Sequence, residues 1–300
     1  MINKEIDAIR VMLAHSPKDP TTAELRKAYE GLGAAYPPAS DVTLRAEEIK
    51  GMKAEWSSTP NADPDRVTLY LHGGGYVIGS LASHRHLVAE LGRASGTRTL
   101  AIDYRLAPEA PFPAAVDDAL TAYKFLLANG IDPASIAIAG DSAGGGLTIA
   151  TLVAARDAGL PQPACAVCIS PWVDLEMLGA SMTSKANEDP LLQRDLLVYW
   201  SATYLNGAAP RTPRAAPMYA DLKGIAPLLI QVGSAEILLD DAVRLAARAS
   251  AQNVSVRFES WPEMIHVWHF FHPVLAEGRR GIEVAGEYVK QYVTRDGRDA

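Results

Sequence analysis

Cysteine is scarce in this chain, with only two among 300 residues. That number excludes a disulfide-stapled fold, and no second Cys or His pair at zinc spacing accompanies them. Cys165 and Cys168 lie in an apolar run that predicts a buried strand. Residues three apart on a strand point to opposite faces, so the two thiols could not readily share a metal or a disulfide. We expect two small buried side chains and no metal site.

Basic clusters and long apolar runs are also missing. The 28 basic and 35 acidic residues give a formal net charge of −7, which supplies no positive surface for nucleic acid or an anionic membrane. No run approaches the roughly 18 apolar residues of a membrane span. The first seven residues carry acidic side chains where a signal peptide needs an apolar stretch. These absences predict a cytoplasmic protein with no nucleic-acid partner and no membrane span.

Apolar sequence is plentiful, at 48% of the chain, and occurs as short runs that alternate with helical patterns. This alternation predicts the α/β class, with a mostly parallel, doubly wound sheet flanked by helices. The expected strands are 67–71, 97–102, 136–139, 164–169, 227–232 and 255–260, and the expected helices are 83–94, 113–128, 143–158, 239–251 and 274–293.

Two regions fall outside the alternation. Residues 1–50 contain helical patterns at 4–15 and 21–33, and residues 178–217 contain an aromatic-rich helical pattern at 191–205. A helical insertion after a late strand would lie over the carboxyl edge of the sheet, where open α/β sheets bind ligands. We expect the two regions to pack together as a cap, with residues 51–177 and 218–300 forming the α/β domain. The alternative is that the first helices simply cover a face of the sheet.

A candidate nucleophile follows the apolar run 136–139. The pentapeptide Gly140-Asp141-Ser142-Ala143-Gly144 precedes a helical pattern, and the Gly-x-Ser-x-Gly pattern in that position is typical of a nucleophile elbow. The sharp turn would hold the serine in a strained backbone region. Glycines two residues away on either side avoid a collision across the turn. Ser142 is therefore the expected nucleophile of an acyl-transfer enzyme.

A glycine-rich segment, His72-Gly73-Gly74-Gly75-Tyr76, follows the expected strand 67–71. Consecutive glycines leave backbone N–H groups free to point at one spot, as acyl transfer requires where negative charge builds on the substrate oxygen. We assign this oxyanion hole to the N–H groups of Gly74, Gly75 and Ala143. The alternative, a phosphate-binding loop, lacks the Gly-x-x-x-x-Gly-Lys and Gly-x-Gly-x-x-Gly patterns.

A serine needs a base to take its proton, and only three of the seven histidines follow Ser142. His266 comes first after the strand 255–260, in a loop at the sheet edge, and is the expected base. His269 and His272 fall in an aromatic helical stretch and are expected to be packed or surface residues. His72 is expected to fix the glycine-rich loop by hydrogen bonding.

The acid that orients this histidine is expected in the loop after strand 227–232. Glu236 lies there, where its carboxylate could accept a hydrogen bond from the histidine Nδ1–H. Asp240 is the alternative acid. Asp240 and Asp241 are more simply explained as the acidic first turn of the next helix, which complements the helix dipole.

Three other residues are candidates for substrate contact. Tyr76 is expected to line the entrance, and Trp172 to shape the acyl side of the pocket, with a core position as its alternative. Asp141 is the third candidate, although bracing the elbow or the glycine-rich loop is its simpler role. The segment Glu188-Asp189-Pro190 is expected to cap the following helix.

Four ordered motifs together resemble the bacterial hormone-sensitive-lipase-like carboxylesterases of the α/β-hydrolase fold. They are His72-Gly73-Gly74-Gly75, Tyr104-Arg105-Leu106-Ala107-Pro108-Glu109, Gly140-Asp141-Ser142-Ala143-Gly144-Gly145 and Ser170-Pro171-Trp172. The resemblance implies a capped carboxylesterase for short- to medium-chain acyl esters, without a cofactor, and a homodimer as a plausible assembly. It also supports Gly74, Gly75 and Ala143 as the oxyanion hole. Many relatives carry Asp-Pro-Leu where this chain has Glu236-Ile237-Leu238, so the acid here would be a glutamate.

Other functions on the same scaffold remain open at this point. A small-molecule receptor would keep the pocket and lose the chemistry, and the simplest such loss would be the histidine. This chain holds competent residues at all three positions. An amidase or a long-chain lipase would use the same residues, and the lipase would favour a larger apolar lid.

Overall fold

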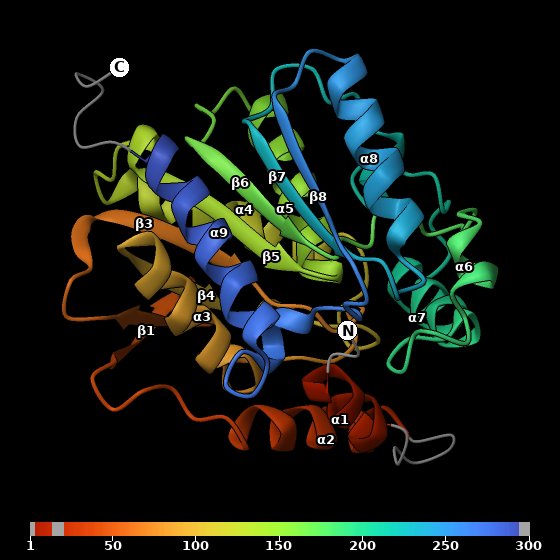
Figure 1. Cartoon of the computed structure of the whole chain (residues 1–300). Helices are drawn as coiled ribbons and strands as arrows, with labels where there is room; N and C mark the ends of the chain where they lie inside the picture. Colours follow the sequence, from red (N-terminus) through yellow and green to blue (C-terminus); the bar gives the residue numbers. More distant parts are fainter. Residues whose placement is uncertain (1–3, 14–20, 294–300) are drawn as a thin grey trace.

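A single sheet organises the chain, of which the computed structural model describes residues 4–13 and 21–293 (Figure 1). The strands are β1 Thr43–Ile49, β2 Met52–Ser58, β3 Asp63–Leu71, β4 Thr97–Ile102, β5 Ile136–Asp141, β6 Cys165–Ile169, β7 Leu228–Gly233 and β8 Val256–Trp261. Their order is β1-β2-β4-β3-β5-β6-β7-β8. The pairs from β4 to β8 are parallel, and β2 is antiparallel to both of its neighbours. The predicted doubly wound α/β sheet is confirmed.

Helices cover both faces of this sheet. They are α1 Lys4–Leu13, α2 Thr22–Ala34, α3 Leu81–Ser95, α4 Ala114–Ala128, α5 Ala143–Asp157, α6 Ser181–Ser184, α7 Arg194–Leu205, α8 Leu239–Ala251 and α9 Ala276–Tyr292. Figure 1 shows α3 and α9 in front of the sheet, and their buried residues share one apolar cluster with α1. The buried residues of α4, α5, α7 and α8 belong to the cluster on the other face.

The cysteines of β6 illustrate this division. Cys165 belongs to the cluster beneath α3 and α9, and Cys168 belongs to the opposite cluster. Both are free and fully buried. The predicted placement on opposite faces is confirmed.

The strands β1 and β2 were missed in the sequence. β1 is almost entirely exposed and rich in charged side chains, so it shows neither an apolar run nor an alternating pattern. Backbone pairing with β2, and of β2 with β4, holds this edge of the sheet. Residues 43–49 therefore belong to the sheet, and the helical part of the first region ends at Ala34.

The two regions outside the βα alternation both contain helices, as predicted. Figure 1 shows α1 and α2 below the sheet and α6 and α7 at its lower right. The last two residues of the expected helix 4–15 lie outside the described residues, and α7 begins three residues later than expected. Within 4–13 and 21–293, none of the helices combines the length and apolar composition that crossing a bilayer requires.

Candidate active site

Ser142 occupies a strained turn between β5 and α5. Its backbone has φ 54° and ψ −121°, a conformation that costs free energy for a residue with a side chain. A Cβ on Gly140 would strike the Gly144 carbonyl, and one on Gly144 would strike the Leu71 carbonyl. The two glycines are thus required by sterics, as the pentapeptide predicts. Ser142 is 8% exposed, so part of it reaches the surface.

The glycine-rich loop after β3 is braced from below by Asp141. The Asp141 Oδ1 atom accepts hydrogen bonds from the Gly73 N–H at 3.0 Å and from the Tyr70 hydroxyl at 2.8 Å. His84 Nε2 lies 3.4 Å from the other carboxylate oxygen. Asp141 has no exposed surface. The structure therefore gives it the bracing role and leaves it no open face for substrate.

Gly74 and Gly75 both adopt positive φ, 117° and 62°, which favours glycine. The Gly74 carbonyl accepts the N–H groups of Val77 and Ile78 at 3.0 and 2.9 Å, which closes the loop into a turn. Ala143 is the first residue of α5, where N–H groups have no partner within the helix and the helix dipole favours negative charge.

Glu236 and His266 form a hydrogen-bonded pair. His266 Nδ1 lies 2.6 Å from Glu236 Oε2, and the side chain of Glu236 is fully buried. The other carboxylate oxygen accepts from the Ser170 hydroxyl at 2.7 Å and from the Gly233 N–H at 2.6 Å. These bonds fix the carboxylate so that it faces Nδ1 and leaves Nε2 for another partner.

The expected alternatives to this pair have other partners. Asp240, in the first turn of α8, accepts from the Ser181 N–H at 2.9 Å. His269 Nε2 lies 2.9 Å from Gln231 Oε1, and burial lowers the pKa of His269 to about 3. Burial also lowers the pKa of His272 to about 4. His72 stacks on Tyr104 at 4.2 Å, and burial lowers its pKa to about 3.

His266 differs from these histidines in its electrostatics. Burial disfavours its charged form, but the negative charges around it, first the charge and the hydrogen bond of Glu236, together outweigh that cost. The charges of Asp189 and Asp141 add to this effect, and the pKa of His266 rises above 6.5. A proton taken up by His266 is therefore stabilised within the site.

Ser142 and the Glu236–His266 pair lie at the same edge of the sheet. Ser142, Ser170, Glu236 and His266 follow the carboxyl ends of β5, β6, β7 and β8, which are neighbours in that order. The Ser142 N–H donates to the Ile169 carbonyl of β6 at 2.8 Å, and the Ser170 hydroxyl accepts from the Val267 N–H at 3.2 Å. The arrangement offers a nucleophile, a base and an oriented acid for acyl transfer.

Aromatic side chains of α7 lie over the glycine-rich loop. The ring of Trp200 occupies the space that a Cβ on Gly75 would need. One turn later, Tyr204 stacks on Tyr76 with ring centroids 3.9 Å apart. Tyr76 and Trp172 are each 1% exposed. Tyr76 therefore does not line an open entrance in this structure, and Trp172 belongs to the core cluster, the alternative given for it. The sequence analysis placed Tyr76 at the entrance because no local pattern shows that Tyr204 of α7 stacks on this ring.

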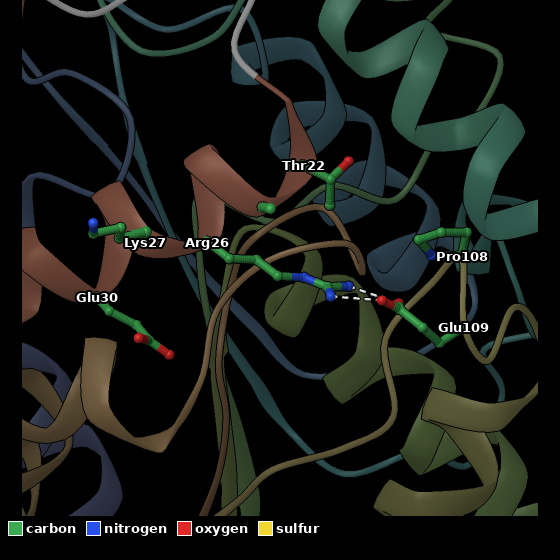
Figure 2. A pocket seen from close by; sticks show the side chains of 7 residues that line it. Thr22, Arg26, Lys27, Glu30, Pro108 and Glu109 are labelled. Atoms are coloured by element: carbon green, nitrogen blue, oxygen red, sulfur yellow. Dashed lines mark hydrogen bonds and ion pairs between the residues drawn. The ribbon is translucent and has the colours of Figure 1, made fainter.

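Arg26 of α2 also holds this loop. Its Nε donates to the Val77 carbonyl at 2.9 Å, and its Nη2 to the Ala107 carbonyl at 3.0 Å. Figure 2 shows Arg26 pointing toward Glu109, with which it forms two hydrogen bonds of 2.7 and 2.8 Å. The pair borders a surface cavity of about 440 Å³.

Sequence reasoning missed the positions of Arg26, Ser170 and His84 in this network. Ser170 belongs to a motif that carried the family resemblance, which was the one available signal. Arg26 and His84 lie on helices without any local pattern that marks them. Within the described ranges, no group of three or more His, Cys, Asp or Glu side chains is placed to hold a metal ion.

Comparisons with known proteins identify the family of the chain. A family model for the alpha/beta hydrolase fold matches residues 68–270. The chain is 46% identical over 296 residues to an acetyl-hydrolase of Streptomyces hygroscopicus, covering 97% of both chains. It is 31% identical over 264 residues to an ethyl acetate hydrolase of Pseudomonas putida, covering 85% of this chain and 83% of that protein.

The fold also matches a solved esterase from the bacterial hormone-sensitive lipase family. The TM-score is 0.96 at 45% sequence identity, over 98% of this chain and 100% of the other. The chain belongs to the hormone-sensitive-lipase-like esterases of the α/β-hydrolase fold and is a carboxylic ester hydrolase.

Proposed function

We propose that the protein is a serine carboxylesterase that works through an acyl-enzyme, with Ser142, His266 and Glu236 as its triad. The hydrogen bond between Glu236 and His266, beside a serine held in a strained turn, is the observation that carries the proposal. His266 takes the proton of Ser142 as its Oγ attacks the ester carbonyl, and Glu236 holds the imidazole in the productive tautomer.

The negative oxygen of the tetrahedral intermediate then rests on the N–H groups of Gly74, Gly75 and Ala143. Protonated His266 gives its proton to the leaving alcohol, which departs as the acyl-enzyme forms. Water, deprotonated by the same histidine, attacks the acyl group and releases the acid. No cofactor takes part in these steps.

The proposed substrates are esters of short- to medium-chain acids. Trp200 fills the space beside Gly75 and so limits the room next to the oxyanion hole. Relatives named acetyl-hydrolase and ethyl acetate hydrolase support small acyl groups. In this proposal, residues 4–34 and 178–217 act as a cap, because Arg26 and Trp200 reach the glycine-rich loop from these two regions.

An acyl-chain series tests this proposal. We expect kcat/KM for p-nitrophenyl esters to fall by about 10-fold or more from butyrate to decanoate, because added methylenes meet the wall formed by Trp200. Trp200→Ala should move the preference toward longer chains, whereas Tyr199→Ala, at an exposed neighbouring position, should leave it unchanged. Equal rates across the series in the wild-type enzyme would contradict the chain-length proposal.

A second expectation concerns the support of the oxyanion hole. Arg26→Ala should lower kcat by about 10- to 100-fold with little change in KM, because the loop carrying Gly74 and Gly75 loses its bond at Val77. Arg85→Ala removes another half-buried arginine, one paired with Glu55, and serves as the matched control. An unchanged kcat in Arg26→Ala would show that the loop keeps its geometry without the guanidinium.

The rival functions are separated by the same assays. A receptor on this scaffold would hydrolyse none of the esters. An amidase would prefer p-nitroanilides over the matching esters, and a long-chain lipase would prefer emulsified triglycerides. Homodimerisation and a cytoplasmic location stay predictions.

A further inference from the structure

A second buried carboxylate lies close to the proposed triad. Asp189 precedes α7 and is 3% exposed. Its Oδ1 atom accepts hydrogen bonds from the Leu191 and Leu192 N–H groups, both at 2.9 Å. No Lys or Arg pairs with it in the part of the chain that the structure describes. A buried carboxylate without a cationic partner is costly, and capping a short turn does not require such burial.

The other oxygen of Asp189 reaches across to the loop of the catalytic acid. Oδ2 accepts from the Ile237 N–H at 2.9 Å, and Ile237 directly follows Glu236. The same loop is held a second time from this region, since the Ser181 hydroxyl donates to the Ile237 carbonyl at 2.6 Å. The region between β6 and β7 therefore makes two hydrogen bonds to Ile237, the residue that follows Glu236.

The charges that face His266 come from three elements. Glu236 follows β7, Asp141 ends β5, and Asp189 lies in the region before α7. Glu236 makes the hydrogen bond, and Asp141 is committed to the glycine-rich loop. Burial raises the pKa of the Asp189 carboxyl, and the positive charge of protonated His266 opposes that rise. The two groups therefore interact with each other in both directions.

We infer that Asp189 is a positioning residue of the esterase reaction, which anchors the Glu236 loop to the cap region and adds a further buried negative charge near His266. The inference rests on the proposed function. When His266 carries the proton of Ser142, its positive charge is stabilised by Asp189 as well as by Glu236 and Asp141, and the extra charge stabilises the ion pair that forms in the transition state. The anchor keeps Glu236 facing Nδ1.

The pH profile of kcat/KM tests this role in the full-length enzyme. The base must be neutral, so activity rises with pH through the pKa of His266. Removing a negative charge beside His266 lowers that pKa. Asp189→Asn should therefore shift the acid limb of the kcat/KM profile to lower pH by about 0.5 to 1 unit. It should also lower kcat, with a smaller change in KM. Asp189→Ser keeps an acceptor for the Leu191 turn and should give the same shift.

Glu188→Gln is the matched control, because it removes the same charge from the neighbouring residue, whose carboxylate is exposed and pairs with Lys185. Its acid limb should coincide with that of the wild type. An unshifted limb in folded Asp189→Asn and Asp189→Ser, or an equal shift in Glu188→Gln, would overturn the inference. A failure of the proposed function itself would give a different result: the Ser142→Ala variant would hydrolyse esters as fast as the wild type.

Discussion

Ser142→Ala should lower kcat for p-nitrophenyl butyrate by a factor on the order of 10⁶, and His266→Ala by a similar factor. The nucleophile and its base act as one unit, so removing either should cost nearly as much as removing both. The double variant should therefore be no slower than the single variants. Hydrolysis measured at neutral pH, with the melting temperature checked beside it, tests the pair.

His272→Ala supplies the control for this experiment. His272 lies six residues after His266 and is half-buried, and its ring stacks on that of His86 at 5.4 Å. Its loss should leave kcat within a few-fold of the wild type, even if stability changes. Retention of more than about 1% of turnover in folded Ser142→Ala or His266→Ala would rule out the assigned nucleophile and base.

Glu236→Gln should lower kcat by about 10⁴-fold. The amide replaces an acceptor with a group that can donate, so the imidazole no longer holds its proton on Nδ1 and cannot accept one from Ser142. The variant keeps the size of the side chain and can keep the bonds from Ser170 and Gly233 to Oε1. The fold should therefore survive, and circular dichroism can verify that it does.

Asp240→Asn provides the comparison, since Asp240 was the alternative acid. Its carboxylate accepts from the Ser181 N–H in the first turn of α8. Losing its charge should cost stability through the helix dipole, by about 0.3 to 1 kcal/mol, and should change kcat little. A larger loss of kcat from Asp240→Asn than from Glu236→Gln would transfer the acid role to Asp240.

The candidate nucleophile, acid and base could be named from the sequence because each follows a predicted strand. β5 is wholly buried and ends in the glycine turn of Ser142. The order of strands along the chain then placed Glu236 and His266 at the same edge. The chosen acid and base proved to be hydrogen-bonded to each other, and the glycines of the elbow proved to be required by sterics.

The supporting contacts could not be predicted, because they join residues far apart in the chain through single side chains. Arg26 and Val77 are 51 residues apart, and Asp189 and Ile237 are 48 apart. No periodic pattern encodes such a contact. β1 was missed for a related reason. Its pairing uses backbone groups, and its charged side chains suit an exposed sheet edge, which must resist pairing with other chains.

The placement of the two cysteines on opposite faces of β6 has a practical consequence. Burial raises the pKa of Cys165 to about 12, and it raises that of Cys168 further. Neither side chain offers a reactive thiolate to the solvent at neutral pH. Covalent reagents that acylate, phosphorylate or sulfonylate proteins will therefore meet no competing thiolate in this enzyme. An adduct formed under native conditions can be assigned to oxygen or nitrogen chemistry without blocking the thiols first.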